Sequence, residues 1–176
     1  MRIEVKDVVG WHEVMDAARE TVWKNPVEEG HEPSLAFKKQ ILEDEHSPIR
    51  VRMLKIRMIG IPYFLSVHLV RHKYGVEHFV STQRDDRNPE RKMSRKDMPQ
   101  GALVNHTMYI NAQELMFISR RRLCGKADPD MRNLWRSVID KVREVDPVLA
   151  DYCVPMCVYR NGCHEANPCG VYKSTN

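Results

Sequence analysis

The stretch VHLVRHKYGVEHFVSTQR, residues 67–84, decides how the chain around it is interpreted. Its apolar residues continue a run that begins at Tyr63, and together they predict a mostly buried helix to Lys73 that Gly75 closes. EHFVSTQ, residues 77–83, predicts a strand. Histidine, arginine and lysine side chains therefore crowd the junction between a buried helix and a strand.

The cations at this junction have two interpretations. In the last turn of a helix, Arg71, His72 and Lys73 complement the negative end of the helix dipole and serve as a cap. His68 lies one turn before His72, on the same face of the predicted helix. Clustered cations also suit an anionic ligand, phosphate above all, because the arginine fork matches its oxygens. More cations follow along the chain: Arg84, Arg87, Arg91, Lys92, Arg95, Arg120, Arg121, Arg122 and Lys126.

Hydrophobic periodicity predicts an α+β class, with helices covering a small sheet. Strands are indicated at residues 3–9 and 54–59. Helices are predicted at residues 11–24 and 33–45, at Asn105–Cys124 and Asp130–Val145, and briefly from Pro147. Residues 85–101 predict a polar, proline-punctuated loop.

Length and charge set further bounds. A chain of 176 residues is long enough for one domain, residues 1–176, with a cysteine-rich tail at residues 153–176. The net charge of +4 is too small to imply nucleic-acid binding. The sequence has neither the roughly 20 apolar residues of a membrane span nor a signal peptide, so no membrane partner is expected and the predicted location is cytoplasmic.

The five cysteines are Cys124, Cys153, Cys157, Cys163 and Cys169. An odd count crowded towards the C-terminus fits a reducing compartment better than a disulfide framework. Three of these cysteines could form a zinc site with His164. Their five-residue gaps are wider than the spacing of ordinary zinc knuckles, so no metal site is expected.

RHKYGVEHFVSTQR, residues 71–84, resembles the signature R-H-R-x-x-S-x-N-E-x-S-x-R-Y of the flavin-dependent thymidylate synthases. Arg71, His72 and Ser81 match in register, and Lys73 replaces a third basic residue. The departures are Val76 for serine, His78 for asparagine, Phe79 for glutamate, and Gln83-Arg84 for Arg-Tyr.

A second motif follows in the same order. NAQELMFISRRRLCGKADPDMR, residues 111–132, is similar to the family's N-A-R-x-L-x-x-F-x-x-L-R-x-C-x-x-A-Q-W-E-I-R. The tail PMCVYRNGCHEANPCG, residues 155–170, looks like the P-x-C-x(5)-C-P-E-x(3)-C-G ending of some members. Arg50 stands where the family usually has glutamate, and the link from Arg84 to Arg95 is shorter than in typical members.

The resemblance implies a small, mostly antiparallel sheet covered by helices and an enzyme that moves a one-carbon unit from methylenetetrahydrofolate to carbon 5 of dUMP, with FAD as cofactor and NADPH as reductant. It implies a homotetramer with shared active sites. By resemblance Arg122 is catalytic and also binds substrate. The other expected substrate residues are His68, Ser81, Gln83, Arg84 and Arg95; the expected cofactor residues are Ser47, Arg71, His72, Lys73, Asn111 and Lys126.

Alternatives stay open at three points. Asn111 could be a helix N-cap, a common use of asparagine. The departures in the signature also suit hydroxymethylation or a cytosine nucleotide, because specificity depends on which base edge is hydrogen-bonded. A relative without catalysis would keep the basic cleft only to bind nucleotide or RNA phosphate.

Overall fold

The computed structural model describes residues 1–28, 30–90 and 92–171, so Arg91 and the last five residues of the tail lie outside it. No helix in these ranges is both long and apolar enough to cross a membrane. The strands are β1 (Arg2–Val9), β2 (Met53–Pro62), β3 (Val76–Val80) and β4 (Leu103–Asn111). The helices are α1 (Trp11–Glu20), α2 (Leu35–Glu43), α3 (Tyr63–Leu69), α4 (Ala112–Arg122), α5 (Pro129–Val145), α6 (Pro147–Tyr152) and α7 (Met156–Tyr159), with 3-10 turns η1 (Ser47–Arg50), η2 (Asp85–Arg87) and η3 (Arg95–Asp97).

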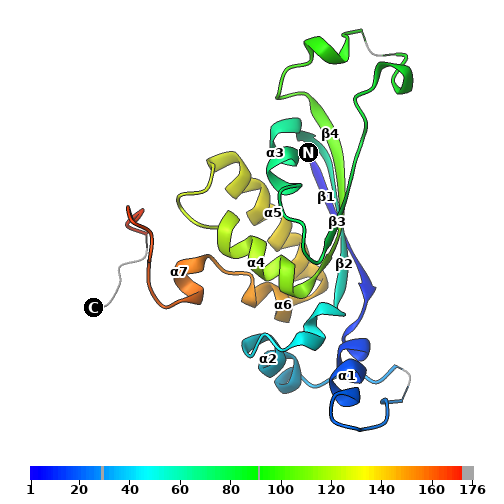
Figure 1. Cartoon of the computed structure of the whole chain (residues 1–176), viewed down its shortest axis with the longest axis vertical. Helices are drawn as coiled ribbons and strands as arrows, with labels where there is room; N and C mark the ends of the chain where they lie inside the picture. Colours follow the sequence, from blue (N-terminus) through cyan, green and yellow to red (C-terminus); the bar gives the residue numbers. More distant parts are fainter. Residues whose placement is uncertain (29, 91, 172–176) are drawn as a thin grey trace.

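The four strands form one antiparallel sheet in the order β1-β2-β4-β3, and α3, α4 and α5 lie on one side of it (Figure 1). This confirms the predicted α+β class and the small antiparallel sheet. Alternate residues of β2, Leu54, Ile56 and Met58, are buried in the same core as Trp135 of α5. Each such side chain contributes about 1.5–3 kcal/mol by leaving water.

A buried ion pair ties the start of β2 to the start of α6. The guanidinium of Arg52 is 1% exposed, and its Nη2 lies 2.9 Å from Oδ2 of Asp146. The same carboxylate accepts from the indole N–H of Trp11 at 2.8 Å and from the backbone N–H of Leu149 at 3.0 Å. Asp7 pairs with Arg52 from β1 at 2.6 Å. This arginine therefore has a structural role, because its contacts with Asp7 and Asp146 hold β1 and the start of α6 to the start of β2.

The helix predicted at Asn105–Cys124 is wrong in its first half. Residues 103–111 form β4, whose buried residues Val104, His106, Met108 and Ile110 alternate with more exposed ones. The alternation is that of a strand with one face on the core. A histidine at an inward position hid this pattern in the sequence.

The predicted helix to Lys73 also ends too late. α3 stops at Leu69, so Arg71, His72 and Lys73 lie in the connection to β3 and not in a last helical turn. Gly75 closes this connection with a φ of +68°, a conformation that favours glycine. The cap interpretation of the three cations is therefore wrong, and their side chains stand in a loop beside the sheet.

Candidate functional site

A cavity of about 470 Å³ lies where the start of α4 meets the loop before β3. Aromatic faces and charged groups line it together, a composition that suits a ligand with both a ring system and polar edges. Its walls are formed by Glu45, Arg50, Tyr74, Gly75, Asn111, Gln113, Glu114, Phe117 and Arg120. Of the residues expected to bind the cofactor, only Asn111 is in this wall.

Asn111 is the N-cap of α4. Its Oδ1 accepts from the backbone N–H of Glu114 at 2.9 Å, which is the alternative use considered for this residue. Gly75 packs directly against it: a Cβ at Gly75 would lie 2.5 Å from the amide nitrogen of Asn111. Glycine thus lets the loop before β3 approach α4 and brings Asn111 to the cavity.

Arg120 supplies a buried charge that the sequence did not reveal. It was compatible with a solvated helix face, yet the structure leaves it only 7% exposed. Its Nη1 donates to Oε2 of Glu45 at 3.2 Å, and its guanidinium lies 3.5 Å from the ring centroid of Tyr159. Glu45 is 75 residues earlier in the chain, so no local pattern could have indicated the pair.

Arg122, at the end of α4, is held in place by two acceptors. Its Nη2 donates to the backbone carbonyl of His68 at 2.8 Å, and its Nε donates to Nε2 of His72 at 3.2 Å. Burial, and then the neighbouring Arg71, lower the pKa of the Arg122 guanidinium, which still stays protonated at neutral pH. Nδ1 of His72 lies 3.6 Å from Glu114, so His72 connects Arg122 to the cavity wall.

A chain of hydrogen bonds between side chains ends at the backbone carbonyl of His72. Nε2 of His78 lies 2.8 Å from the carbonyl of His72, Nδ1 of His78 lies 2.9 Å from Nε2 of His106, and Nδ1 of His106 lies 3.0 Å from Oγ of Ser66. A carbonyl only accepts, so Nε2 of His78 must carry its proton. It follows that His106 donates to His78 and Ser66 donates to His106. All bonds run in one direction when both imidazoles are neutral.

Several expected substrate residues lie on the segment between β3 and β4. We call residues 81–90 and 92–102 the arm; Figure 1 shows it projecting beyond the end of the sheet, away from α4. Ser81, at its base, binds Asn105 through its Oγ at 2.9 Å. On the arm, Arg84 pairs with Asp86 at 2.7 Å, and the N–H of Arg95 donates to Asp85 at 2.8 Å. Gln83, half-buried, lies between Ser81 and Arg84 on the same segment.

The remaining expected residues lie outside the wall of this cavity. Ser47, exposed, begins η1, the turn that ends at the cavity residue Arg50. Lys126, also exposed, lines a different cavity at the end of α4. His68, on α3, has a buried Nδ1 that finds no hydrogen-bond partner in the described ranges. An unpaired buried nitrogen beside Arg122 is a position where a ligand could donate or accept.

Comparison with known proteins gives a consistent picture, although no family model matches. The flavin-dependent thymidylate synthase of Sulfolobus acidocaldarius is 31% identical over 71 residues, which are 40% of this chain and 27% of that protein. The enzyme of that name from Clostridium tetani is 38% identical over 61 residues, 35% of this chain and 24% of that protein. The match therefore spans about a quarter of these relatives' length.

Solved structures extend the likeness to the whole fold. Thymidylate synthase X (ThyX) of Helicobacter pylori, crystallised with FAD and dUMP, aligns with 88% of this chain and 99% of its own at a TM-score of 0.68 and 15% identity. The chain has a ThyX-like fold. The UMP/dUMP methylase PolB of Streptomyces cacaoi, bound to 5-Br dUMP, aligns with 86% of this chain and 94% of its own. Its TM-score is 0.61 and its identity is 14%.

Three departures from the signature, at Val76, His78 and Phe79, lie on β3 and have distinct surroundings. Val76 is buried in the core, which explains an apolar residue in place of serine. His78 joins the hydrogen-bond chain to Ser66. Phe79 is 60% exposed and packs edge-on against Tyr109 at 5.9 Å, on the face of β3 away from His78. Of these three changes, only the one at His78 joins the hydrogen bonds that reach His72.

The stability of the ThyX-like fold should fall in mild acid because of His106. Burial, and then the nearby His78, lower the pKa of His106 from 6.5 to about 4. Below pH 6.5 the unfolded chain therefore takes up a proton that the folded chain refuses until about pH 4. The free energy of unfolding should drop by roughly 3 kcal/mol across this window from this group.

Urea unfolding at several pH values between 7 and 4 measures this loss. His106→Gln is the reference, because it removes the titrating group. Between pH 7 and pH 4 its free energy of unfolding should fall by about 3 kcal/mol less than that of the wild type. An equal fall of the unfolding free energy with pH in the two proteins would show that His106 is not the group responsible.

Proposed function

We propose that this chain transfers a one-carbon unit from methylenetetrahydrofolate to carbon 5 of dUMP, giving dTMP, with FAD as cofactor and NADPH as reductant. The observation that carries the proposal is Arg122: a half-buried guanidinium fixed by His68 and His72, whose other N–H donors remain for a substrate. The names of the curated relatives and the fold shared with ThyX and PolB support it.

The residues around the first cavity fit a flavin. Tyr74 and Phe117 offer aromatic faces, and Asn111 and Gln113 offer polar edges. Arg71 and Lys73 are exposed in the adjoining loop, where they suit a pyrophosphate. In this proposal those cations hold the phosphates with Ser47 and Lys126, while His72 and Asn111 contact the ring system.

Most of the residues assigned to dUMP lie on two separate parts of one chain, the arm and the end of α4. Ser81, Gln83, Arg84 and Arg95 are assigned to dUMP, with Ser81 and Arg95 on its phosphate, yet the arm extends away from α4. A second copy of the chain could bring its arm to this cavity. The proposal therefore includes a homotetramer with shared active sites.

The chemistry assigned to the protein is electrostatic. Bound FAD would supply hydride and the means of carrying the one-carbon unit. As carbon 5 of the uracil attacks, negative charge grows on the carbonyl oxygens of the base, and a guanidinium already in position stabilises it without reorganising. His72 orients this guanidinium, and Nδ1 of His72 lies 3.6 Å from Oε1 of Glu114. His68, with its unpaired Nδ1, is assigned to the base.

The deciding experiment pairs a spectrum with an assay. The absorbance spectrum of freshly purified protein, with and without added FAD, should show a resolved flavin band. The same protein should then form dTMP from dUMP, methylenetetrahydrofolate and NADPH. Product from dCMP in its place, or a hydroxymethyl product, would redirect the substrate assignment. A colourless protein that ignores added FAD would overturn the function and leave the fold untouched.

A further inference from the structure

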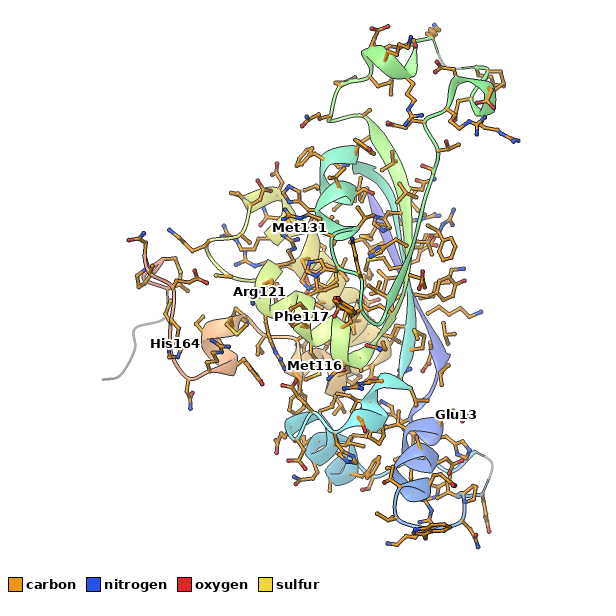
Figure 2. All side chains as sticks on the ribbon, in the orientation of Figure 1. Glu13, Met116, Phe117, Arg121, Met131 and His164 are labelled. Atoms are coloured by element: carbon orange, nitrogen blue, oxygen red, sulfur yellow. The ribbon has the colours of Figure 1, made fainter. Side chains whose placement is uncertain are left out.

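A second cavity, of about 200 Å³, lies between the end of α4 and the C-terminal tail. Four of the five cysteines line it. Cys124 comes from the residues just after α4, whereas Cys157, Cys163 and Cys169 come from the tail. The other residues of its wall are Arg121, Lys126, Met156, Arg160, His164 and Glu165, and Figure 2 labels Arg121 and His164 on the two segments that enclose it.

We propose that Cys124, Cys157, Cys163 and Cys169 bind one Zn²⁺ as a four-thiolate site. The spacing within the tail argued against a metal, because three cysteines five residues apart do not form a knuckle. The fold changes this judgement by adding Cys124, which is 33 positions before Cys157 in the sequence. Four thiolates satisfy the tetrahedral preference of a structural zinc.

Two local features at Cys124 prepare it for this role. The backbone N–H of Lys126 points at the sulfur of Cys124, 3.5 Å away, and such N–H groups stabilise a metal-bound thiolate. Gly125 lies between them, and a Cβ there would be 2.7 Å from the sulfur of Cys169. The lack of a side chain at this position is what allows the tail cysteine to approach the end of α4.

The charges around the cavity favour thiolates. Each of the four thiols must release a proton to bind, so the occupied site would carry a net charge of −2. Arg121 and Arg160 line the same cavity and offset that charge.

A metal site would fix the position of the tail. It leaves the core after Cys153, and between Cys153 and Val171 the single turn α7 is its only helix. All five thiols are free, and within the described ranges no three ligating side chains are gathered closely enough to enclose an ion. Binding would therefore draw the loops of the tail inward until the sulfurs surround the metal at about 2.3 Å.

Cys153 provides an internal control. It is 4% exposed in the core, away from the cavity, and burial raises the pKa of its thiol to about 12. A thiol that stays protonated is a poor ligand. Cys153→Ala should therefore leave metal binding unchanged, while Cys163→Ser and Cys169→Ser should remove it.

Untagged full-length protein, purified under reducing, anaerobic conditions, is incubated with ZnCl₂, passed over a desalting column and analysed for metals. We expect about one zinc per chain in the wild type and in Cys153→Ala, and a background level in the two serine variants. Cobalt in place of zinc should give the intense visible bands of a tetrahedral thiolate complex, a readout that needs no enzyme activity.

Other results would overturn the proposal. They are zinc retained by both serine variants, no stoichiometric metal after incubation, iron with acid-labile sulfide in place of zinc, or a disulfide between these cysteines in the anaerobic protein. Circular dichroism of each variant separates metal loss from unfolding. The outcome is independent of dUMP turnover, so this proposal and the proposed function can fail separately.

Discussion

Replacing Arg122 by alanine is expected to leave a folded protein that binds FAD but turns over dUMP roughly 100- to 1,000-fold more slowly. The expectation follows from removing a fixed donor aimed at charge that develops during the reaction. Arg122→Lys should recover little of the rate, because an ammonium cannot donate to His68 and His72 through one planar fork. Initial rates of dTMP formation and flavin absorbance measure the two effects.

The control for this change is Arg136→Ala. Arg136 is an exposed arginine on α5, outside both cavities, so the same loss of charge should leave the rate unchanged. Wild-type turnover in Arg122→Ala would refute the catalytic assignment. Loss of flavin from Arg122→Ala would make the residue a cofactor ligand instead.

Replacing Asp146 by alanine should lower the free energy of unfolding by about 3–5 kcal/mol. The change leaves the guanidinium of Arg52 buried without its main partner, which costs far more than the pair itself contributes. It also leaves the indole N–H of Trp11 without its acceptor and removes the N-cap of α6. The midpoint of urea unfolding, with an unchanged slope, reports the loss.

Asp151→Ala is the matched control. Asp151 pairs with Arg143 on the surface, where both side chains are about half exposed. Exposed pairs of this kind contribute about 0–1 kcal/mol. A small effect at Asp146, no larger than at Asp151, would show that the buried network is not what joins the sheet to α6.

The sequence predicted most of the fold because its patterns are local. α2 begins after its N-cap Ser34, and α5 begins after Asp128 with its apolar face intact, as the periodicity of both segments indicated. β4 was missed because His106 occupies a core position, and only the contacts with Ser66 and His78 make that position suitable for a polar side chain.

The candidate site was predictable in part. Resemblance to a known signature drew attention to Arg122, His72 and Asn111, and the structure brings the three to one region. It could not indicate Glu45 and Arg120, whose pairing depends on how η1 packs against α4. Nor could it separate Arg95 from Arg122, because the direction of the arm is a property of the folded chain.

The hydrogen-bond chain from Ser66 to the carbonyl of His72 also constrains how this protein can change over generations. Each donor in it has one acceptor, so altering His78 alone would leave His106 buried with nothing to receive its proton. Substitutions at these two positions should therefore arise together in any lineage. A relative with asparagine at the place of His78 is expected to carry a different partner at the place of His106. His78, which stands where the family signature has asparagine, would then be inherited together with His106.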